Sequence, residues 1–329
     1  MEMIFGITMG DASGVGPEIL LKAYAAGELR HPVVAFGDQQ LHERGNREVG
    51  LGVPLREVDS PQEYQPGALN VRDLARLRAD EVRIGQVDPR SGAAARDYVV
   101  EATQAALKGE IAAIVTLPIN KEATQASDPS FTGHTELIGE LCGARDVTIM
   151  LASDELIVTH VTTHMSLRRA LEEIRRERVL RVIEMTCEAV ARLRPQPRVA
   201  VAGLNPHAGE NGLFGREEIE EIAPAVEQAR RQGLPVEGPV PPDTVFYLAA
   251  RRKRYEAVVA MYHDQGHIPL KLLDFEGGVN VTLGLPIIRT SVDHGTAFDI
   301  AWKGIASTRS LVRALEMAVR LAGLKSAST

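Results

Sequence analysis

The chain has 329 residues, of which 44 % are hydrophobic and 25 % charged, and it carries a formal net charge of −7 at pH 7. This length and composition predict a globular protein of about two domains with a sizeable core. No basic cluster carries interleaved aromatics and the aromatic content is only 4 %, which argues against nucleic acid as the main partner. No apolar run approaches the roughly 20 residues of a membrane helix.

The cysteines and the first residues bear on the cellular compartment. Cys142 and Cys187 lie far apart, in no metal-binding or redox-active spacing, so a reducing compartment is expected. The opening MEMIFGITMGD has no basic region and turns polar at Asp11, unlike a signal peptide. These features predict a cytoplasmic protein.

Strand and helix patterns alternate along the chain. Short runs rich in β-branched residues predict strands at 3–8, 32–37, 111–116, 147–152, 156–161, 198–204, 257–262 and 279–285. Amphipathic stretches predict helices at 17–29, 91–110, 167–194, 216–233 and 307–323. The segment 50–88 is polar and proline-bearing and gives no clear pattern. The alternation predicts an α/β protein with a mainly parallel sheet.

Polar residues directly follow four of the apolar strands. IAAIVT leads into LPINKE, LIVTHV into TTHMS, RVAVAGL into NPHAGENG, and AVVAMY into HDQGH. In open α/β sheets, ligands bind beyond the carboxyl ends of the strands. We therefore expect these polar segments to lie on the rim of a cleft.

Histidines are frequent in these segments. Three neutral imidazoles with an open coordination position make a divalent-metal site that polarises a substrate oxygen. Any one of these histidines taken alone is more often an ordinary hydrogen-bonded core or surface residue, and spacing does not select three among them. The candidates are His134, His160, His164, His207, His263, His267 and His294.

Three further segments each allow a functional and an ordinary interpretation. The turn MGDASGVGPE, residues 9–18, has either backbone N–H groups turned to an anion or only a tight strand–helix connection. The stretch from Gly284 to Ala306 suits either a nucleotide ribose or a plain helix-entry loop. Three polar side chains around the last predicted strand suit either a phosphate or carboxylate, or solvent: Lys271, Asn280 and Arg289.

Taken together, these motifs resemble the 4-hydroxythreonine-4-phosphate dehydrogenases of the vitamin B6 pathway. The resemblance covers nearly the whole chain, through GITMGDASGVGPEI, VTLPINKEA, GHTELI, HVTTHMSL, GLNPHAGENGLFGREE, GPVPPDT, MYHDQGH and GVNVTLGLPIIRTSVDHGTAFDIA. The tail DHGTAFDIAWKGIA is also similar to the nucleotide loop of isopropylmalate dehydrogenases. The resemblance implies an isocitrate/isopropylmalate dehydrogenase-like fold, with two α/β/α lobes and a cleft between them. We expect residues 1–130 and 290–329 in one lobe, and 131–289 in the other, with the metal ligands and dimer contacts.

The resemblance also implies roles for individual residues. A divalent metal is expected on His164, His207 and His263; three imidazoles suit zinc, and cobalt, manganese or magnesium would also serve. The expected partners are NAD and a second copy of the chain, in a homodimer whose metal ligands come from both subunits. The family has no such role for His160 or His267, so they are expected to be ordinary histidines. The remaining assignments are substrate binding by His134, Thr135, Lys271, Asn280 and Arg289, cofactor binding by His294, Gly295 and Asp299, and proton abstraction by Asp243, Asp264 or Lys121.

The expected chemistry is oxidation of the C3 hydroxyl of a four-carbon 4-phosphorylated hydroxy acid by NAD, followed by β-decarboxylation. Two departures bear on the substrate. Ala12 and Ser13 replace the usual Pro and Ala of the opening, and GHIPLKLL differs from the GLPVLK-like text of the pyridoxine biosynthesis enzyme. The second change slightly favours a paralogous branch that oxidises D-threonate or D-erythronate 4-phosphate. Alternatives from other classes are a metal-dependent lyase or phosphatase without nicotinamide and a non-catalytic sugar-phosphate sensor.

Overall fold

The protein forms two compact units in the computed structural model, which describes residues 2–275 and 277–323. The first unit comprises Met1–Arg145 and Leu285–Thr329, and the second comprises Asp146–Gly284. The first unit extends beyond the expected boundary at residue 130 because a helix at His134–Leu141 packs on the long helix Pro89–Leu107 through Val99, Leu137 and Ile138.

The first unit is built on a fully parallel sheet with strand order β3-β4-β2-β1-β5-β12. Strands β1, β2 and β5 are buried along their whole length, as expected of parallel strands covered on both faces. The strands are β1 (Phe5–Thr8), β2 (Val33–Gly37), β3 (Leu55–Val58), β4 (Leu69–Asp73), β5 (Ala113–Thr116) and β12 (Arg289–Ser291).

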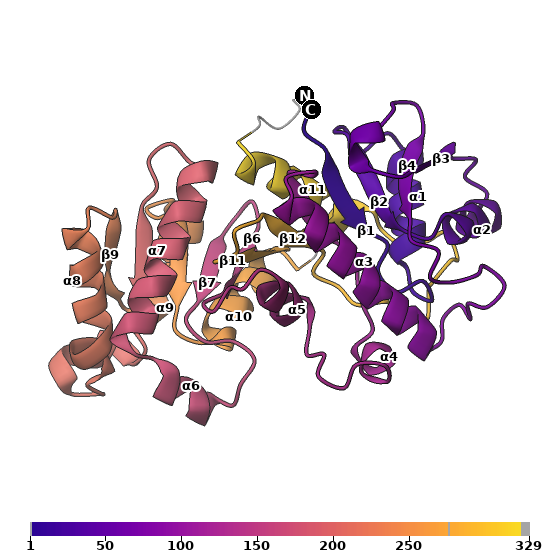
Figure 1. Cartoon of the computed structure of the whole chain (residues 1–329). Coiled ribbons are helices and arrows are strands. Elements are labelled where there is room, and N and C mark those ends of the chain that lie inside the picture. Colours follow the sequence, from indigo (N-terminus) through magenta and orange to yellow (C-terminus); the bar gives the residue numbers. More distant parts are fainter. Residues whose placement is uncertain (1, 276, 324–329) are drawn as a thin grey trace. The chain divides into compact units, whose positions relative to one another are not determined.

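Helices cover this sheet (Figure 1). The long helix α3 packs on the face formed by Val34, Phe36 and Ile114, while α11 contacts β5 and β12 and also packs with α1. The helices of the first unit are α1 (Gly16–Ala25), α2 (Gln39–Val49), η1 (Pro61–Glu63), α3 (Pro89–Leu107), α4 (Lys121–Gln125), α5 (His134–Leu141) and α11 (Arg309–Leu321).

The second unit has the strand order β11-β6-β7-β10-β8-β9. Its strands β7, β10, β8 and β9 are parallel to one another, whereas β6 is antiparallel to both β7 and β11. The strands are β6 (Thr148–Ala152), β7 (Ile157–His160), β8 (Val199–Ala202), β9 (Val236–Val240), β10 (Ala257–Ala260) and β11 (Val279–Leu283).

The core of the second unit includes a cluster that joins this sheet to α9 and α10, in which Val158, Val258, Val245 and Leu270 are fully buried. Helix α7 contacts β7, β8, β10 and β11 and packs with α8. The helices are α6 (Leu167–Glu173), α7 (Arg176–Leu193), η2 (Pro206–Gly212), η3 (Glu218–Ile222), α8 (Ala223–Arg231), α9 (Pro242–Ala250) and α10 (His263–Leu273).

All eight strands predicted from the sequence are present. The predicted helix at 167–194 is interrupted, because Ile174 leaves helical geometry (φ −76°, ψ 89°) and is buried at 1 % exposure. The patternless segment 50–88 contains β3 and β4. The sequence analysis did not predict α2, α4, α5, α9, α10, β9 or β12.

The two ends of the second unit meet. Gly284, its last residue, adopts a left-handed conformation (φ 88°), and a Cβ there would overlap the carbonyl oxygen of Asp146, its first residue. The adjoining residues continue the contact, because Leu283 pairs with Thr148 in the β11–β6 ladder. The chain therefore enters and leaves this unit at one place.

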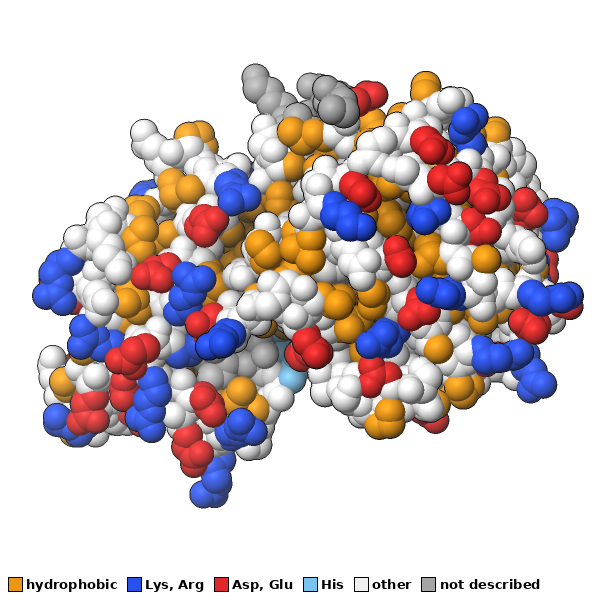
Figure 2. Space-filling model, viewed as in Figure 1, with side chains coloured by type: hydrophobic (Ala, Val, Ile, Leu, Met, Phe, Trp, Pro, Cys, Tyr) orange, Lys and Arg blue, Asp and Glu red, His pale blue; other side chains and the backbone are white. Residues whose placement is uncertain are grey.

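On the face drawn in Figure 2, acidic and basic side chains are intermixed, with no dominance of one charge. Among the described residues, no helix is both long and apolar enough to cross a membrane.

Candidate active site

The segment that follows β10 builds a histidine pocket in the second unit. The strand ends at Ala260, and α10 begins at His263, so the histidine occupies the first turn of a helix directly after a buried strand. The ring of His164 lies 5.5 Å from that of His263, centroid to centroid. Both histidines line a pocket of about 330 Å³ with Thr163, Met165, Leu167, Ala170, Tyr262 and Asp264.

Asp264 orients the ring of His263. The Nδ1 of His263 lies 2.7 Å from Oδ1 of Asp264, and because the carboxylate accepts, Nδ1 donates. The lone pair of His263 is therefore on Nε2, the arrangement that a carboxylate gives to a metal-binding imidazole. This contact commits one oxygen of Asp264, which is one of the three candidates for the base.

His207 lies in a separate, unusually shaped loop. Residues 207–211 all have positive φ, between 43° and 82°, and only one of them is glycine. The buried carboxylate of Glu218 holds the start of this loop by accepting from the backbone N–H groups of Leu204 and Asn205, both at 2.7 Å. Left-handed residues cost free energy unless their surroundings fix them, and Glu218 supplies part of that fixation.

Gln265 connects the loop to α10. Its Nε2 donates to the carbonyl oxygen of Gly203 at 2.8 Å, and its Oε1 accepts from the N–H of Met261 at 2.6 Å. The glutamine of the HDQG motif is therefore a structural bridge between the segments that carry His263 and His207. Sequence reasoning gave no role to Gln265 or Glu218, since nothing in the spacing showed which backbone groups they would meet.

The three expected metal ligands do not form one cluster. His207 is exposed and its ring is 6.1 Å from that of Phe214, whereas His164 and His263 share a pocket. In the part of the chain that the structure describes, no group of three or more His, Cys, Asp or Glu side chains is arranged to hold a metal ion. One chain thus presents two of the three imidazoles together.

The other candidates of the second unit lie on α9, α10 and β11. Asp243 is exposed in the first turn of α9, a helix that contacts the segment of His207. Lys271 is in the last turn of α10, with Nζ 5.2 Å from the ring centroid of Phe275. Asn280 is on β11, where its Oδ1 is buried and has no hydrogen-bond partner among the described residues.

In the first unit, Arg289 is the central candidate. It is the first residue of β12, only 3 % of it is exposed, and Thr116 Oγ1 accepts from its Nε at 3.2 Å and from its Nη2 at 2.7 Å. Burial lowers the pKa of this guanidinium to about 10, and the nearby Glu136 opposes that change. Arg289 therefore remains a cation at neutral pH, inside a surrounding that favours an anionic ligand.

His134 lies beside this cation as the first residue of α5. Burial lowers its pKa well below the usual range, the charges of Arg289 and Lys121 add to that effect, and a hydrogen bond to the backbone of Leu117 opposes it. The ring is therefore neutral, and its Nε2 is buried without a partner among the described residues. Since the bond to Leu117 uses the other nitrogen, Nε2 is an acceptor suited to a substrate hydroxyl.

Two neighbouring candidates complete this group. Lys121 is exposed at the start of α4 and Thr135 is the second residue of α5. The Cε of Lys121 lies 3.9 Å from the position that a Cβ would take at Gly133, the residue before His134. The structure therefore brings Arg289, His134 and Lys121 together, with Thr135 adjacent in the chain.

The candidate cofactor residues lie in an irregular loop between β12 and α11. His294, Gly295 and Asp299 are exposed there, and Ala297 and Trp302 have positive φ. His294 Nδ1 is 3.0 Å from the carbonyl oxygen of Gly295. The loop precedes α11, as the sequence indicated.

Helix α1 holds this loop in place. The Nζ of Lys22 donates to the carbonyl oxygens of Gly304 and Ala306, at 2.7 and 2.6 Å. The buried Glu18 accepts from the N–H of Ala306 at 2.9 Å. The loop that would hold the cofactor is thus fixed at its far end by two residues of one helix turn.

The turn at residues 9–18 follows the ordinary interpretation. The N–H groups of Asp11, Gly14 and Val15 donate to carbonyl oxygens, and that of Ser13 donates to Oδ1 of Asp11 at 2.9 Å. These groups are used inside the protein, and the whole turn is buried. The turn therefore supplies close packing and not an anion-binding cradle.

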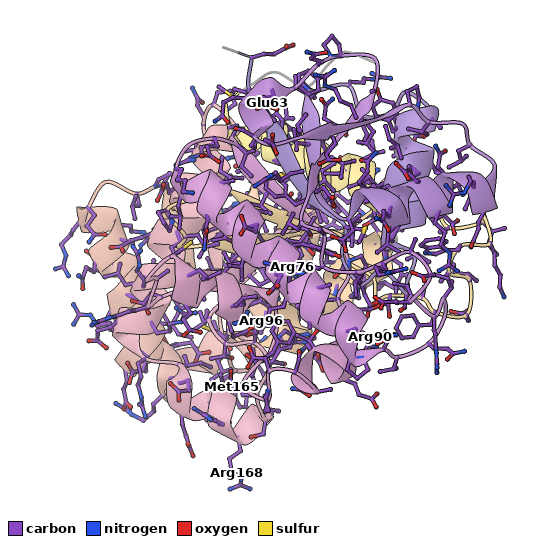
Figure 3. The ribbon with its side chains drawn as sticks, turned by 45° about the vertical axis from the view of Figure 1, so that its right-hand side comes forward. Glu63, Arg76, Arg90, Arg96, Met165 and Arg168 are labelled. Atoms are coloured by element: carbon purple, nitrogen blue, oxygen red, sulfur yellow. The ribbon has the colours of Figure 1, made fainter. Side chains whose placement is uncertain are left out.

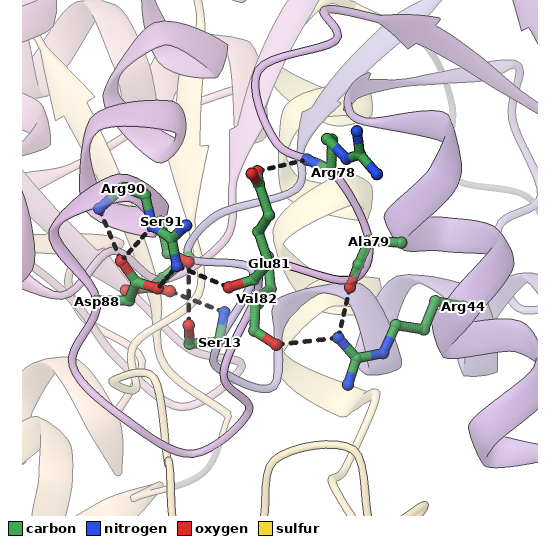
Figure 4. A network of polar contacts seen from close by, with 10 residues as sticks. Ser13, Arg44, Arg78, Ala79, Glu81, Val82, Asp88, Arg90 and Ser91 are labelled. Carbon is green, nitrogen blue, oxygen red and sulfur yellow. Dashed lines mark hydrogen bonds and ion pairs between the residues drawn. The ribbon is translucent and has the colours of Figure 1, made fainter.

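The segment between β4 and α3, residues 74–88, packs on this turn. Gly85 donates to the carbonyl oxygen of Ser13 at 2.8 Å, and Arg44 of α2 donates to the carbonyl oxygens of Ala79 and Val82 (Figure 4). On the other side, Arg76, labelled in Figure 3, pairs with Asp97 of α3 at 3.0 Å. Arginine–carbonyl hydrogen bonds therefore fix the backbone conformation of residues 74–88, in which the sequence shows no clear pattern.

Comparison with known proteins identifies the family. The family described as pyridoxal phosphate biosynthetic protein PdxA matches residues 28–318, well over half of the chain. The chain belongs to this family. Membership confirms the expected relationship and the enzyme class, a dehydrogenase.

Individual relatives agree with this result. The chain is 46 % identical to the D-threonate 4-phosphate dehydrogenase of Pectobacterium atrosepticum, over 98 % of this chain and 100 % of the relative. It is also 46 % identical to a 4-hydroxythreonine-4-phosphate dehydrogenase of known structure from Klebsiella pneumoniae, with a TM-score of 0.89 over 98 % and 100 % of the two chains.

A more distant structure concerns the fold alone. A β-decarboxylating dehydrogenase from Thermococcus kodakarensis is 13 % identical and has a TM-score of 0.51, over 98 % of this chain and 85 % of that one. The expected α/β fold of the decarboxylating dehydrogenases is therefore confirmed.

Proposed function

We propose that this chain oxidises the C3 hydroxyl of a four-carbon 4-phosphorylated hydroxy acid with NAD, and that the resulting β-keto acid loses its carboxylate as CO₂. The observation that carries the proposal is the group around Arg289, where a buried guanidinium lies beside a neutral histidine with an unpartnered acceptor. A buried cation favours an anion, and an acceptor favours a hydroxyl. A phosphorylated hydroxy acid carries both.

The substrate contacts follow from these properties. Arg289 binds the phosphate with its planar, multiple-donor fork, and His134 accepts from a substrate hydroxyl through Nε2. Lys271 and Asn280 of the second unit, together with Thr135, are the other residues that the family resemblance assigns to the substrate. Anchoring the phosphate away from the reacting carbon lets binding energy orient C3 for hydride transfer.

NAD, when bound, accepts the hydride from C3. We assign the loop with His294, Gly295 and Asp299 to this cofactor. Asp299 is exposed and would accept hydrogen bonds from the adenosine ribose hydroxyls while repelling a 2′-phosphate. The expected preference is therefore NAD over NADP.

A divalent metal fits the histidine pocket in part. His164 and His263 lie at a ring separation of 5.5 Å, compatible with nitrogen atoms sharing one ion at about 2.0–2.1 Å, and Asp264 leaves Nε2 of His263 available. When bound, the metal supplies Lewis acidity that favours loss of the alcohol proton and of the carboxylate. Zinc is the first candidate, and cobalt, manganese or magnesium are alternatives.

We propose that the protein acts as a homodimer and that His207 completes the metal site from a second copy. The pairing of His164 with His263 in one chain, apart from His207, supports this arrangement. The expected compartment is the cytoplasm, in keeping with Cys142 and Cys187 as free thiols.

The contact between Asp264 and His263 supports a choice among the candidates for the base. Asp264 Oδ1 accepts from His263, so we assign it the orientation of that ring. Lys121 and Asp243 are then the groups left to take the C3 hydroxyl proton. Lys121 adjoins His134 and Arg289. If Lys121 is the base, Lys121→Met should lower kcat more than Asp243→Asn does.

Two relatives that are equally identical to this chain are named for different substrates. The choice of substrate therefore depends on the segment GHIPLKLL. We favour D-threonate 4-phosphate over 4-hydroxythreonine 4-phosphate. The test follows NADH formation with both compounds, with D-erythronate 4-phosphate and with the unphosphorylated forms. D-Threonate 4-phosphate should give the highest kcat/KM, and loss of the phosphate should lower kcat/KM at least a hundredfold, roughly the 3–5 kcal/mol of an unpaired buried cation.

Two results would contradict the proposal. No NADH formation with any phosphorylated compound would favour a lyase, a phosphatase or a binding protein. Equal turnover of the phosphorylated and unphosphorylated acids would show that Arg289 does not hold a phosphate.

A further inference from the structure

The ring of His263 is stacked on a second histidine. His267 lies one helical turn further along α10, and the two imidazole rings are 3.6 Å apart, centroid to centroid, at an angle of 11°. His263 has 36 % of its side-chain surface exposed, and its other polar partner, Asp264, is 67 % exposed. The face of His267 is therefore the rigid element that limits the tilt of the His263 ring.

His267 is itself anchored. Its Nδ1 lies 3.1 Å from the backbone carbonyl oxygen of His263 and 3.1 Å from Nε2 of His160. A carbonyl oxygen only accepts, so Nδ1 of His267 carries the proton and donates to both. The tautomer and the plane of the His267 ring are fixed by this pair of acceptors.

The histidine that anchors His267 lies in the core of the second unit. His160, the last residue of β7, has no exposed surface, and its Nδ1 is 3.3 Å from the carbonyl oxygen of Ile149. That nitrogen therefore donates, which leaves Nε2 of His160 as the acceptor that His267 needs. The two hydrogen bonds run in one direction, from α10 through His160 to the backbone of β6.

The close approach of helix α10 to His160 requires a glycine at position 266. A Cβ at Gly266 would overlap Nε2 of His160, and Gly266 has no positive φ that would otherwise call for glycine. Glycine at the fourth position of HDQGH, Gly266, thus has a steric reason that is independent of the hydrogen bonds. Helix α10 is seated directly against the imidazole of His160.

We infer that His160 and His267 are positioning residues for His263, holding its ring in the plane from which Nε2 binds a divalent metal. The inference rests on the proposed metal site and extends it to two histidines that the family pattern leaves without a role. A ligand whose ring is held before binding loses less conformational freedom when the ion arrives. Partners of this kind typically change metal affinity 10- to 100-fold.

The test measures Co²⁺ binding to the full-length protein by competition with a chromophoric chelator, and records the visible spectrum of the Co²⁺ form. His267→Leu and His160→Leu should each weaken Co²⁺ binding at least tenfold. The double variant should be no weaker than the weaker single variant, because the two residues act as one unit. His267→Phe, which keeps a flat ring against His263 but cannot donate to His160, should weaken Co²⁺ binding about as much as His160→Leu does.

Controls separate this inference from the metal site itself. His42→Leu removes a buried histidine of the first unit and should leave Co²⁺ affinity unchanged. His263→Ala should lose Co²⁺ binding; if it binds as well as wild type, the proposed metal site fails. If His263→Ala behaves as expected while the variants of His160 and His267 stay within twofold of wild type, or their effects simply add, the positioning role alone is wrong.

Folding of each variant is checked by thermal unfolding without metal. Where His160→Leu does not fold, His267→Phe replaces it in the comparison, because it removes the same hydrogen bond. Unchanged affinity in both His267→Leu and His267→Phe would overturn the inference.

Discussion

The group around Arg289 in the first unit and the histidine pocket of the second are built in different ways. Arg289 starts a buried strand, is 3 % exposed and is held by Thr116 of the neighbouring strand. His263 is partly exposed, lines an open pocket with His164, and is separated from the third expected ligand. A buried cation must be stabilised when the chain folds, because its desolvation cannot wait for a ligand. Neutral imidazoles carry no such cost, so a metal site can be left incomplete.

Removing a metal ligand should have the largest effect and should depend on metal. We expect His263→Ala to lower kcat by about four decades, because the acidity of a metal-bound oxygen rises by many orders of magnitude. His164→Gln, which keeps an oxygen ligand, should regain part of its activity in excess Co²⁺. Steady-state rates over a Co²⁺ titration measure both. Full activity of His263→Ala after exhaustive chelation would remove the histidine pocket from the mechanism.

Replacing the buried cation should have a smaller effect that metal does not change. Arg289→Met should reduce kcat/KM for the phosphorylated substrate by about two to three and a half decades, corresponding to roughly 3–5 kcal/mol. The kcat/KM of Arg289→Lys should lie between those of wild type and Arg289→Met, since lysine keeps the charge but not the planar fork. The control is Arg169→Met, an exposed residue on α6 of the second unit. If excess Co²⁺ restores Arg289→Met, the two groups do not act as separately as described.

The loop that we assign to the cofactor, between β12 and α11, offers an intermediate effect. Lys22→Met leaves the carbonyl oxygens of Gly304 and Ala306 without their donor, at a cost of about 1–3 kcal/mol. KM for NAD should rise about tenfold, while KM for the phosphorylated acid stays within twofold. Lys22→Arg should recover most of the loss. Equal increases in both KM values would mean that α1 supports the unit in general and not the cofactor loop.

The smallest expected effect is on the pH dependence of the free energy of unfolding, to which one buried histidine of each unit contributes. Burial lowers the pKa of His42 to about 4, and that of His160 to about 3, both below the usual 6.5. Between pH 6.5 and 4 the unfolded chain binds a proton that the folded chain does not, so stability falls as the pH falls. His42 alone accounts for about 3 kcal/mol over this range. His42→Leu should flatten that part of the profile in urea unfolding at pH 7, 5.5 and 4.5; a slope equal to that of wild type would contradict the assignment.

Much of the fold could be predicted from the sequence because its buried strands are continuous apolar runs. Parallel strands buried on both faces have no polar face, so β1, β2, β5 and β10 were evident. Edge strands such as β3 are partly exposed and short, and α10 begins with the polar text HDQGH. Their conformation is determined by tertiary contacts, among them Gln265 to Gly203, which no local pattern encodes.

The candidate site likewise has a part that the sequence predicts and a part that it does not. Residue identities came from motifs, and the structure places Arg289, His134 and Lys121 in one group and His164 and His263 in another. The supporting residues were out of reach, because Glu218, Lys22 and His160 act on backbone groups or side chains distant in sequence. The role of each depends on which atoms the fold brings within about 3 Å, and this is a property of packing and not of composition.

The meeting of Asp146 and Gly284 has a consequence for the history and the engineering of the chain. Because the second unit begins and ends at one place, the first unit could be closed by a short turn joining Arg145 to Leu285, without stretching its strands. In genetic terms, residues 146–284 have the architecture of an insertion within a host domain. A deletion of this segment and a separately expressed 146–284 fragment are therefore reasonable starting points for dividing the protein into independently folding modules.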